Sequence, residues 1–364
     1  MTQREQEILT ILKRQPTISQ QELADALGIT RSSVAVHITN LLKKGYLLGK
    51  GYIVNEEPYV VVIGGSNIDI QGFPKSTLIL GDSNIGTVKI SLGGVGRNIA
   101  ENLARLGVNT RLVSVVGDDP YGQKILDEAR SVGLDMSESL VLKGEATSIY
   151  LSILNQSGDM EVAIAHMDSI DRMTSQFIRS KRQWIENASL VVLDANLPTE
   201  VIETLVTTFQ KTVFFLDPVS TAKALKVKPL IGSFHTIKPN LIEAEMLTGV
   251  KIQSQADLIE ASKVFHEFGV KRVFISLGPK GVFVSDQGKT SMIDALPVQV
   301  ANATGAGDAF MAGLVFAFTQ GESIEETSRI AMACAALALS HEDTINPGLS
   351  QRTLSEKLKE KKHV

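Results

Sequence analysis

The chain has almost no cysteine. Cys334 is the single thiol among 364 residues, so no disulfide can form within the chain and no site built on several cysteines can bind a metal. The charge is also nearly balanced, with 36 lysines and arginines against 40 aspartates and glutamates. A net charge of −4 excludes a protein that coats nucleic acid over its whole surface, although it leaves room for a local basic patch.

Long hydrophobic runs are missing as well. The most apolar stretch, near 330–340, is much shorter than the roughly 20 residues that a helix needs to cross a bilayer. The first residues are charged and lack the apolar segment of a secretory signal. We therefore expect a cytoplasmic protein that does not enter a membrane.

What is present begins with a distinct N-terminal segment, residues 1–55. Apolar residues recur at helical spacing in 5–13, Ser19 and Glu22 have the spacing of a helix-capping box, and Gly28 separates two further helices. A short hairpin is expected over 45–54. Three helices followed by a hairpin resemble a winged helix-turn-helix domain, whose recognition helix enters the major groove of DNA.

This resemblance implies DNA contacts from the helix that begins after Thr30. The candidate residues are Arg31, Ser32, Ser33 and His37. Residues 1–57 hold seven lysines and arginines and six aspartates and glutamates, a net charge of +1, whereas strong DNA binding usually needs a clearer basic patch. An oligomerisation module that does not touch DNA is the alternative.

The rest of the chain alternates short β-branched runs with segments of helical periodicity. This alternation predicts a doubly wound α/β domain over 59–350, with a mostly parallel sheet and helices on both faces. Two segments, about 70–92 and 146–165, break the alternation and are expected to form a small separate sheet. Residues 67–69 are expected to end the first strand, and 351–364 to form a charged tail that is solvated over 357–362.

The strongest chemical signal lies near the C-terminus, where Gly305, Ala306 and Gly307 precede Asp308 and an apolar helix. Three small residues ahead of a helix leave backbone N–H groups open to an anion, which the helix dipole also favours. A carboxylate beside an anion site repels the anion, so its presence there is best explained by a chemical role. Taking the proton of an attacking hydroxyl is such a role. On spacing alone, a glycine-rich turn with an aspartate cap explains the segment equally well.

Two other segments have spacings that suit a phosphotransferase. Asn240 and Glu243 stand three residues apart at the start of a predicted helix, where they either hold a hydrated magnesium ion or form a capping box. Ser276, Gly278 and Gly281 follow a predicted strand, and they either let a nucleotide approach the backbone or make a plain turn.

The first part of the same domain offers partners for hydroxyl groups. Asn67 and Asp69 stand at the end of the first predicted strand, and a glycine-rich loop containing Gly94 opens a helix at Asn98. This loop lacks the first-strand position and the later acidic residue of a dinucleotide-binding fingerprint.

Taken together, segments 93–107, 240–243 and 304–308 resemble the PfkB, or ribokinase-like, family of carbohydrate and nucleoside kinases. The resemblance covers about 59–350 and implies ATP and Mg²⁺, with a small β-sheet lid that closes over the substrate. It implies Asp308 as the base and Gly305, Ala306 and Gly307 as the anion hole. The further residues that it implies are Asn67, Asp69, Gly94 and Asn98 for the substrate, Asn240, Ser276, Gly278 and Gly281 for ATP, and Glu243 for Mg²⁺.

Segments 82–86, 93–100, 148–152 and 158–164 resemble those of the bacterial pseudouridine kinases, and so does Asn302. That similarity implies transfer of phosphate from ATP to the 5′-hydroxyl of pseudouridine, with Asn84 and Ser148 as candidates for reading the base. Another nucleoside or a sugar is the alternative substrate. The family resemblance also implies a homodimer paired through the lids. Asn302 stands where most of the family has an aspartate that helps to hold a monovalent cation, so a potassium requirement is left open.

A second hypothesis concerns the whole chain. In a ligand-sensing transcription regulator, the kinase-like domain would only bind its ligand while residues 1–55 bind an operator. The two functions can coexist, because an intact catalytic set does not exclude a DNA-binding arm.

Overall fold

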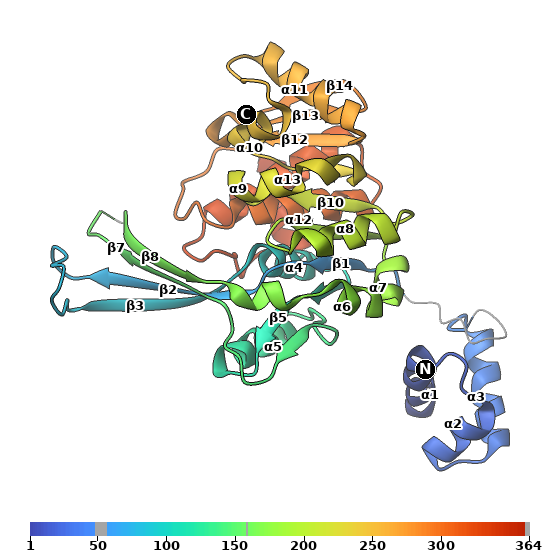
Figure 1. Ribbon diagram of the computed structural model, residues 1–364. Helices are drawn as coiled ribbons and strands as arrows, with labels where there is room; N and C mark the ends of the chain where they lie inside the picture. The colour runs from blue at the N-terminus through green and yellow to red at the C-terminus, as the bar shows by residue number, and fades with distance from the viewer. Residues whose placement is uncertain (48–56, 158, 361–364) are drawn as a thin grey trace. The chain divides into compact units, whose positions relative to one another are not determined.

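The computed structural model describes residues 1–47, 57–157 and 159–360, and the chain divides into two compact units between Pro58 and Tyr59 (Figure 1). Within these described ranges, no helix is both long enough and apolar enough to span a membrane.

The first unit consists of three helices. They are α1 (Gln3–Arg14), α2 (Gln20–Leu27) and α3 (Arg31–Lys43). Buried aliphatic side chains from all three form its core, among them Ile8, Leu23 and Val34. The predicted capping box is confirmed, since Ser19 accepts from the N–H of Glu22 and Glu22 accepts from the N–H of Ser19. The predicted hairpin over 45–54 lies mostly outside the described residues.

The second unit is built on an eight-stranded sheet, and the predicted mostly parallel order is confirmed. Six strands pair in parallel, and the last two strands are added by antiparallel pairings. In spatial order they are β4 (Thr110–Val113), β1 (Val60–Ile63), β9 (Leu190–Asp194), β10 (Phe214–Asp217), β11 (Thr236–Ile237), β12 (Arg272–Ser276), β13 (Val282–Asp286) and β14 (Lys289–Ile293).

Helices cover both faces of this sheet, because its central strands are apolar on both sides. In β1, Val61 and Ile63 enter one core while Val60 and Val62 enter the other. The first core contains α6 (Ser175–Ser180), α7 (Arg182–Glu186), α8 (Thr199–Thr208), α9 (Thr221–Val227), α10 (Leu241–Thr248) and α11 (Gln255–Phe268). The second contains α4 (Val95–Arg105), α5 (Pro120–Ser131), α12 (Ala306–Thr319) and α13 (Ile324–Leu339).

The two segments that broke the alternation form a separate four-stranded sheet, as predicted; we call it the lid. Its order is β3 (Gly86–Gly93), β2 (Asn67–Pro74), β7 (Ile149–Leu154) and β8 (Met160–His166). It extends away from the main sheet in Figure 1. A third small sheet pairs β5 (Val115–Gly117) with β6 (Leu140–Leu142).

Residues 67–69 do not end the first strand, which corrects one prediction. β1 stops at Ile63, and Asn67 begins the lid strand β2. The break occurs at Gly64, where a Cβ would overlap the carboxylate of Asp194 and the backbone of Gly96. A strand with side chains cannot continue through so narrow a space.

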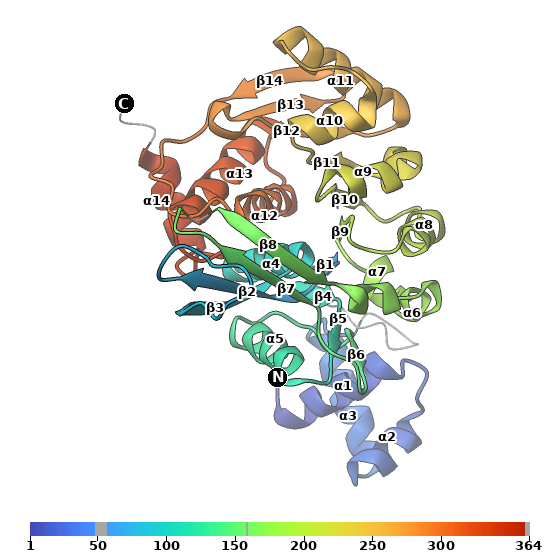
Figure 2. The same cartoon turned by 60° about the vertical axis from the view of Figure 1, so that its left-hand side comes forward.

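The predicted charged tail is a packed helix over its described part, although Lys359 and Glu360 are exposed. Residues 351–360 form a helix, α14 (Gln351–Glu360), which packs against α13 (Figure 2). Leu354 is 3% exposed, and Leu358 lies one turn further along on the same face. The charged residues between them obscured this apolar stripe in the sequence.

Candidate active site

Polar residues gather where the strand order of the main sheet reverses. β1 has β4 on one side and β9 on the other, and Asp194 and Asp217 end β9 and β10. Lys238 directly follows β11. In open α/β sheets, the crevice beyond the carboxyl ends of the strands at such a switch point is the usual ligand site.

Asp194 joins the segments around this crevice. Its Oδ2 atom accepts from the N–H groups of Gly65 and Gly96 at 2.8 and 2.7 Å, and its Oδ1 atom accepts from the N–H of Asn196 at 2.8 Å. The side chain is fully buried. Burial raises the pKa of Asp194, while the backbone hydrogen bonds oppose that rise.

The glycine-rich loop brings α4 close to this carboxylate. Gly94 has a φ of 100°, and a Cβ there would overlap the carbonyl oxygen of Gly65 and the Cα of Ser66. α4 therefore begins against the turn that follows β1, and Asn98 lies in its first turn.

Asn98 contacts Asp308 directly. The Asn98 Nδ2 atom donates to Asp308 Oδ2 at 2.8 Å. The opposite end of the amide accepts from Arg97 Nη1 at 3.3 Å, which fixes which end faces Asp308. Arg97 is buried and paired with Glu101, so the support is rigid. The sequence assigned Asn98 to substrate hydroxyls, whereas in this structure its amide holds the carboxylate.

Asp308 lies in the first turn of α12, after Gly305, Ala306 and Gly307. Gly305 is the N-cap with a left-handed φ of 83°, and no side chain caps the helix. The first N–H groups of α12 are therefore available to an anion. Burial, with repulsion from Asp217, raises the pKa of Asp308 to about 7, while the hydrogen bond from Asn98 and the charge of Lys238 oppose the rise. A carboxyl group that titrates near neutral pH can accept a proton from a hydroxyl.

Asn67 and Asp69 lie together at the base of the lid. Asn67 Nδ2 donates to Asp69 Oδ1 at 2.6 Å, and a Cβ on Gly93 would meet both side chains. Burial raises the pKa of Asp69, against the hydrogen bond from Asn67. The same face of the lid is linked to the main body by an ion pair of 2.9 Å between Lys89 and Asp343.

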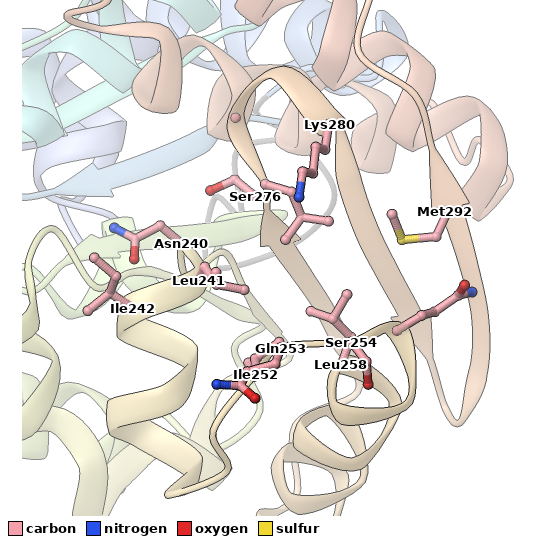
Figure 3. Close-up of a pocket in the computed structure, with 13 residues that line it drawn as sticks. Asn240, Leu241, Ile242, Ile252, Gln253, Ser254, Leu258, Ser276, Lys280 and Met292 are labelled. Carbon is pink, nitrogen blue, oxygen red and sulfur yellow. The ribbon is translucent and has the colours of Figure 1, made fainter.

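Two cavities flank the segment 276–281. One, of about 560 Å³, lies between α10, the start of α11 and β14, and Figure 3 shows Asn240, Ser276 and Lys280 around it. The other, of about 520 Å³, is lined by Lys238, Gly307, Ser276, Gly278 and Gly281 and continues along apolar residues of α13. The second cavity thus joins an apolar groove to the start of α12, while Asn240 lies at the first.

Asn240 and Glu243 form a complete capping box. Glu243 Oε2 accepts from the N–H of Asn240 at 2.8 Å, and Asn240 Oδ1 accepts from the N–H of Glu243 at 2.9 Å. Within the described residues, Glu243 Oε1 takes no hydrogen bond, so one oxygen of this carboxylate is free for another partner. Burial raises the pKa of Glu243, against the bond from Asn240.

The structure does not bring Asn84 or the hydroxyl of Ser148 into this arrangement. Asn84 closes the loop at the end of the lid by bonding to the backbone N–H and carbonyl of Ile79 and to the carbonyl of Asp82. The Ser148 hydroxyl lies 2.6 Å from that of Ser169 and is buried. Local hydrogen bonds satisfy both side chains, which the sequence pattern could not reveal.

Asn302 ties two loops together beside Gly305. Its Nδ2 atom donates to the carbonyl oxygen of Glu342 at 3.0 Å, and its Oδ1 atom accepts from the N–H of Thr304 at 2.9 Å. A neutral amide therefore engages a carbonyl oxygen here.

Three buried charged residues were missed from the sequence: Asp194, Asp217 and Lys238. Each stands at or directly after the carboxyl end of a buried parallel strand. That position was the available signal, because strand ends meet at the ligand-binding edge of such a sheet.

Comparisons with known proteins agree with this geometry. Residues 57–352 match the model of the pfkB family carbohydrate kinases, and residues 1–47 match a winged helix-turn-helix DNA-binding model. The uncharacterized sugar kinase YeiI of Escherichia coli K12 is 41% identical over 96% of this chain and 97% of its own length. The pseudouridine kinase of the same organism is 39% identical over 82% of this chain and 95% of its own length.

Solved structures give the same picture. A Clostridium perfringens protein described as a sugar kinase is 45% identical, with a TM-score of 0.78 over 84% of this chain and 97% of that chain. Arabidopsis thaliana ribokinase, complexed with ribose and ATP, is 25% identical, with a TM-score of 0.72 over 84% of this chain and 99% of that chain.

Fold, site and relatives together define a phosphotransferase that uses an alcohol group as the acceptor. The chain belongs to the PfkB family of carbohydrate kinases, in its ribokinase-like branch of sugar and nucleoside kinases, and carries a winged-helix module at its N-terminus.

We expect the carboxyl group of Asp308 to titrate near pH 7 in ¹³C NMR spectra of aspartate-labelled, ligand-free protein, because its buried position disfavours the charged form. Asn98→Ala should raise this pKa further, since the hydrogen bond that favours the carboxylate is lost. Asn84→Ala is the matched control and should leave it unchanged. The signal is assigned by its absence in Asp308→Asn, and titration near the ordinary 3.8 would contradict the expectation.

Proposed function

We propose that this protein transfers the γ-phosphoryl group of ATP to the 5′-hydroxyl of pseudouridine. The observation that carries the proposal is the contact between Asn98 and Asp308 beside the uncapped start of α12, which sets a base next to an anion site. The choice of pseudouridine is supported by 39% identity to the Escherichia coli pseudouridine kinase over 95% of that protein.

In the proposed reaction, Asp308 accepts the proton of the 5′-hydroxyl as the hydroxyl oxygen attacks the γ-phosphorus. The bond to ADP breaks and its electron pair leaves with ADP. The backbone N–H groups of Gly305, Ala306 and Gly307, at the start of α12, stabilise the negative charge of the transferred group. Asn98 positions the base, so its role is indirect.

The nucleoside would lie between the lid and the start of α4. Asn67, Asp69 and the backbone at Gly94 are proposed to bind ribose hydroxyls, because the two side chains lie together at the base of the lid, beside the loop that opens α4. The ion pair between Lys89 and Asp343 holds the same face of the lid near the loop behind Gly305. Closure of this face over the sugar would exclude water from the phosphoryl group.

ATP is proposed to occupy the cavity of about 520 Å³, with its base on the apolar residues of α13 and its phosphates toward Gly307. Ser276, Gly278 and Gly281 line this cavity. Asn240 is proposed to support the site through the capping box that holds Glu243.

Mg²⁺ fits this chain as an ion shared with the phosphates. Among the described residues no cluster of three metal-ligating side chains exists, whereas Mg²⁺ commonly keeps several waters and takes one or two carboxylates plus phosphate oxygens. Glu243 would hold it, because its Oε1 atom is free. When bound, the ion would draw negative charge from the phosphate oxygens. We assign no role to a monovalent cation, because Asn302 is neutral and its amide already engages Glu342.

The substrate is tested with a panel of pseudouridine, uridine, inosine, ribose and fructose 6-phosphate in the presence of Mg²⁺ and ATP. We expect the highest kcat/KM for pseudouridine and a product phosphorylated at the 5′ position. A clear preference for another acceptor would contradict the assignment of pseudouridine as the substrate. Turnover of no acceptor in the panel would contradict the proposed kinase activity.

Asp308→Asn is the control for the same assay. We expect kcat to fall by about 10²–10⁴-fold, the usual contribution of a general base. The variant should melt no lower than the parent at pH 8, because ionisation of a carboxyl whose folded pKa is raised costs stability as pH rises from its unfolded value toward about 7. Near-parental turnover would remove Asp308 from the base role.

The lid also supports a proposed homodimer. Ile90, Ile70, Leu151 and Ile164 pair across its four strands as one row, so their side chains share a face. Val88 and Val162 belong to the next row and are 67% and 50% exposed. Asp69 lies on the opposite face. An apolar sheet face of this kind is a common association surface, and a second copy presents the same face.

We expect the parent to sediment as a dimer and Val88→Glu to sediment as a monomer, because a charge would be buried in the paired apolar faces. Thr87→Glu is the matched control, since Thr87 is the exposed neighbour on the other face of β3, and it should remain a dimer. A monomeric parent, or a dimeric Val88→Glu, would contradict the lid-to-lid arrangement.

DNA binding is a second candidate function, favoured by the match of residues 1–47 to a winged helix-turn-helix model. Arg31 and Ser32 are exposed at the start of α3, the end of a recognition helix that contacts bases. The hydroxyls of Ser32 and Ser33 both bond to that of Thr30, and His37 is half-buried, so these three are weaker candidates than Arg31. Lys44 is paired with Glu5 and adds little free positive charge.

We expect the full chain to retard DNA from its own upstream region in a gel at 50 mM salt, and Arg31→Ala to weaken that binding. If Arg31 contacts a phosphate, the slope of log K against log salt concentration should decrease in magnitude by about 1 in the variant. Arg14→Ala removes an exposed charge from the end of α1 and is the control. Absence of a shift at this salt would count against DNA binding.

A further inference from the structure

Lys238 is a buried ammonium that the proposed mechanism leaves without a task. It follows β11, next to the end of β10, so the register of the two parallel strands sets it beside Asp217. Its Nζ atom lies 3.1 Å from Asp217 Oδ2, and the side chain is 9% exposed. The plain interpretation is that the lysine only neutralises Asp217.

Two features of this pair point beyond mutual neutralisation. Asp217 Oδ1 accepts from the N–H of Val219 at 2.9 Å, so both oxygens of the carboxylate have protein partners. The ammonium differs, because among the described residues Asp217 is its single acceptor, whereas an ammonium carries three N–H donors. Donors of a buried lysine are costly to leave without partners.

The remaining donors lie at the anion site. A Cβ on Gly307 would stand 3.2 Å from Lys238 Nζ, so the ammonium adjoins the backbone that starts α12. Lys238 and Gly307 line the same cavity, together with Ser276 and Gly278. A positive charge at the end of a cavity, beside uncapped N–H groups, suits the terminal phosphate of a nucleoside triphosphate.

We propose that Lys238 is a catalytic residue, whose ammonium, held by Asp217, donates a hydrogen bond to a non-bridging oxygen of the transferred phosphoryl group. This inference rests on the phosphotransferase activity and is independent of the acceptor. Lys238 keeps its proton throughout: the hydroxyl proton goes to Asp308, the new bond joins the acceptor oxygen to the γ-phosphorus, and ADP departs with the electron pair of the broken bond. The lysine stabilises charge on the group in transit.

The surrounding charges are consistent with a permanently charged lysine. Burial alone would lower the pKa of Lys238, but Asp217, followed by Asp308 and Glu243, outweighs burial, and the pKa is raised. Lys238 in turn opposes the rise in the pKa of Asp308. The ammonium therefore faces the proposed base as well as the anion site, at the place where the hydroxyl, the phosphate and the base must meet.

Binding without an acceptor gives the first test. We expect Lys238→Met to weaken binding of a non-hydrolysable ATP analogue by roughly 10- to 100-fold, as for loss of a hydrogen bond to a charged group, with little change for ADP. Equal losses for both nucleotides, or none, would overturn the contact with the terminal phosphate. Because no acceptor is present, this result does not depend on whether pseudouridine is the substrate.

Measurements of kcat distinguish a catalytic role of Lys238 from a role limited to neutralising Asp217. We expect Lys238→Met to lower kcat by about 10²–10³-fold, the usual effect of losing one such donor, and to move the acidic limb of the pH profile upward. The double variant Lys238→Met/Asp217→Asn removes the orphaned buried carboxylate and keeps the test valid where the single variant folds poorly. It should stay slow while the acidic limb returns toward that of the parent. Recovery of near-parental kcat in the double variant would reduce Lys238 to a partner of Asp217 and overturn the proposal.

Discussion

The carboxylate of Asp194 joins three chain segments on which the site is built. Its two oxygens accept three backbone N–H groups, from the turn after β1, the start of α4 and the loop after β9. Such a bundle of buried N–H groups needs acceptors, and a single residue at the end of β9 supplies them. Loss of that acceptor would leave three buried donors unsatisfied, at roughly 1–3 kcal/mol each.

The position of α4 follows from this clamp, and the position of the proposed base follows from α4. Gly64 and Gly96 let the two backbones approach the carboxylate, where a Cβ on either would overlap it or the facing backbone. Asn98 is then set one turn into α4, within 2.8 Å of Asp308. The three carboxylates near the crevice have different partners. Backbone N–H groups bond to Asp194, and Lys238 and Val219 bond to Asp217. Asn98 bonds to Asp308, whose pKa burial raises to about 7.

The sequence predicted what local periodicity records and missed what the topology brings together. The ends of α11, for example, carry local signals, a capping box at Ser254 and a left-handed Gly269. The parallel sheet and the separate lid were also predictable from alternation. The partner of Asn98 was not, because 210 residues separate it from Asp308 and no local pattern reports such a contact. The sequence also could not show that the side chains of Asn84 and Ser148 form hydrogen bonds with nearby groups, because these bonds depend on loop geometry.

The lid has one polar face and one apolar face, because side chains alternate along its strands. Side chains alternate along β2 and β3, so Asp69 and Ser91 face one side while Ile70 and Ile90 face the other. A slip of one residue would exchange the faces, placing isoleucines against the crevice and Asp69 outside. The register must therefore be fixed at the base of the lid, where Asn67 pairs with Gly93. A Cβ on Gly93 would overlap the carboxylate of Asp69 and the amide of Asn67, so the absence of a side chain there permits the contact of Asn67 with Asp69 on the polar face of the lid.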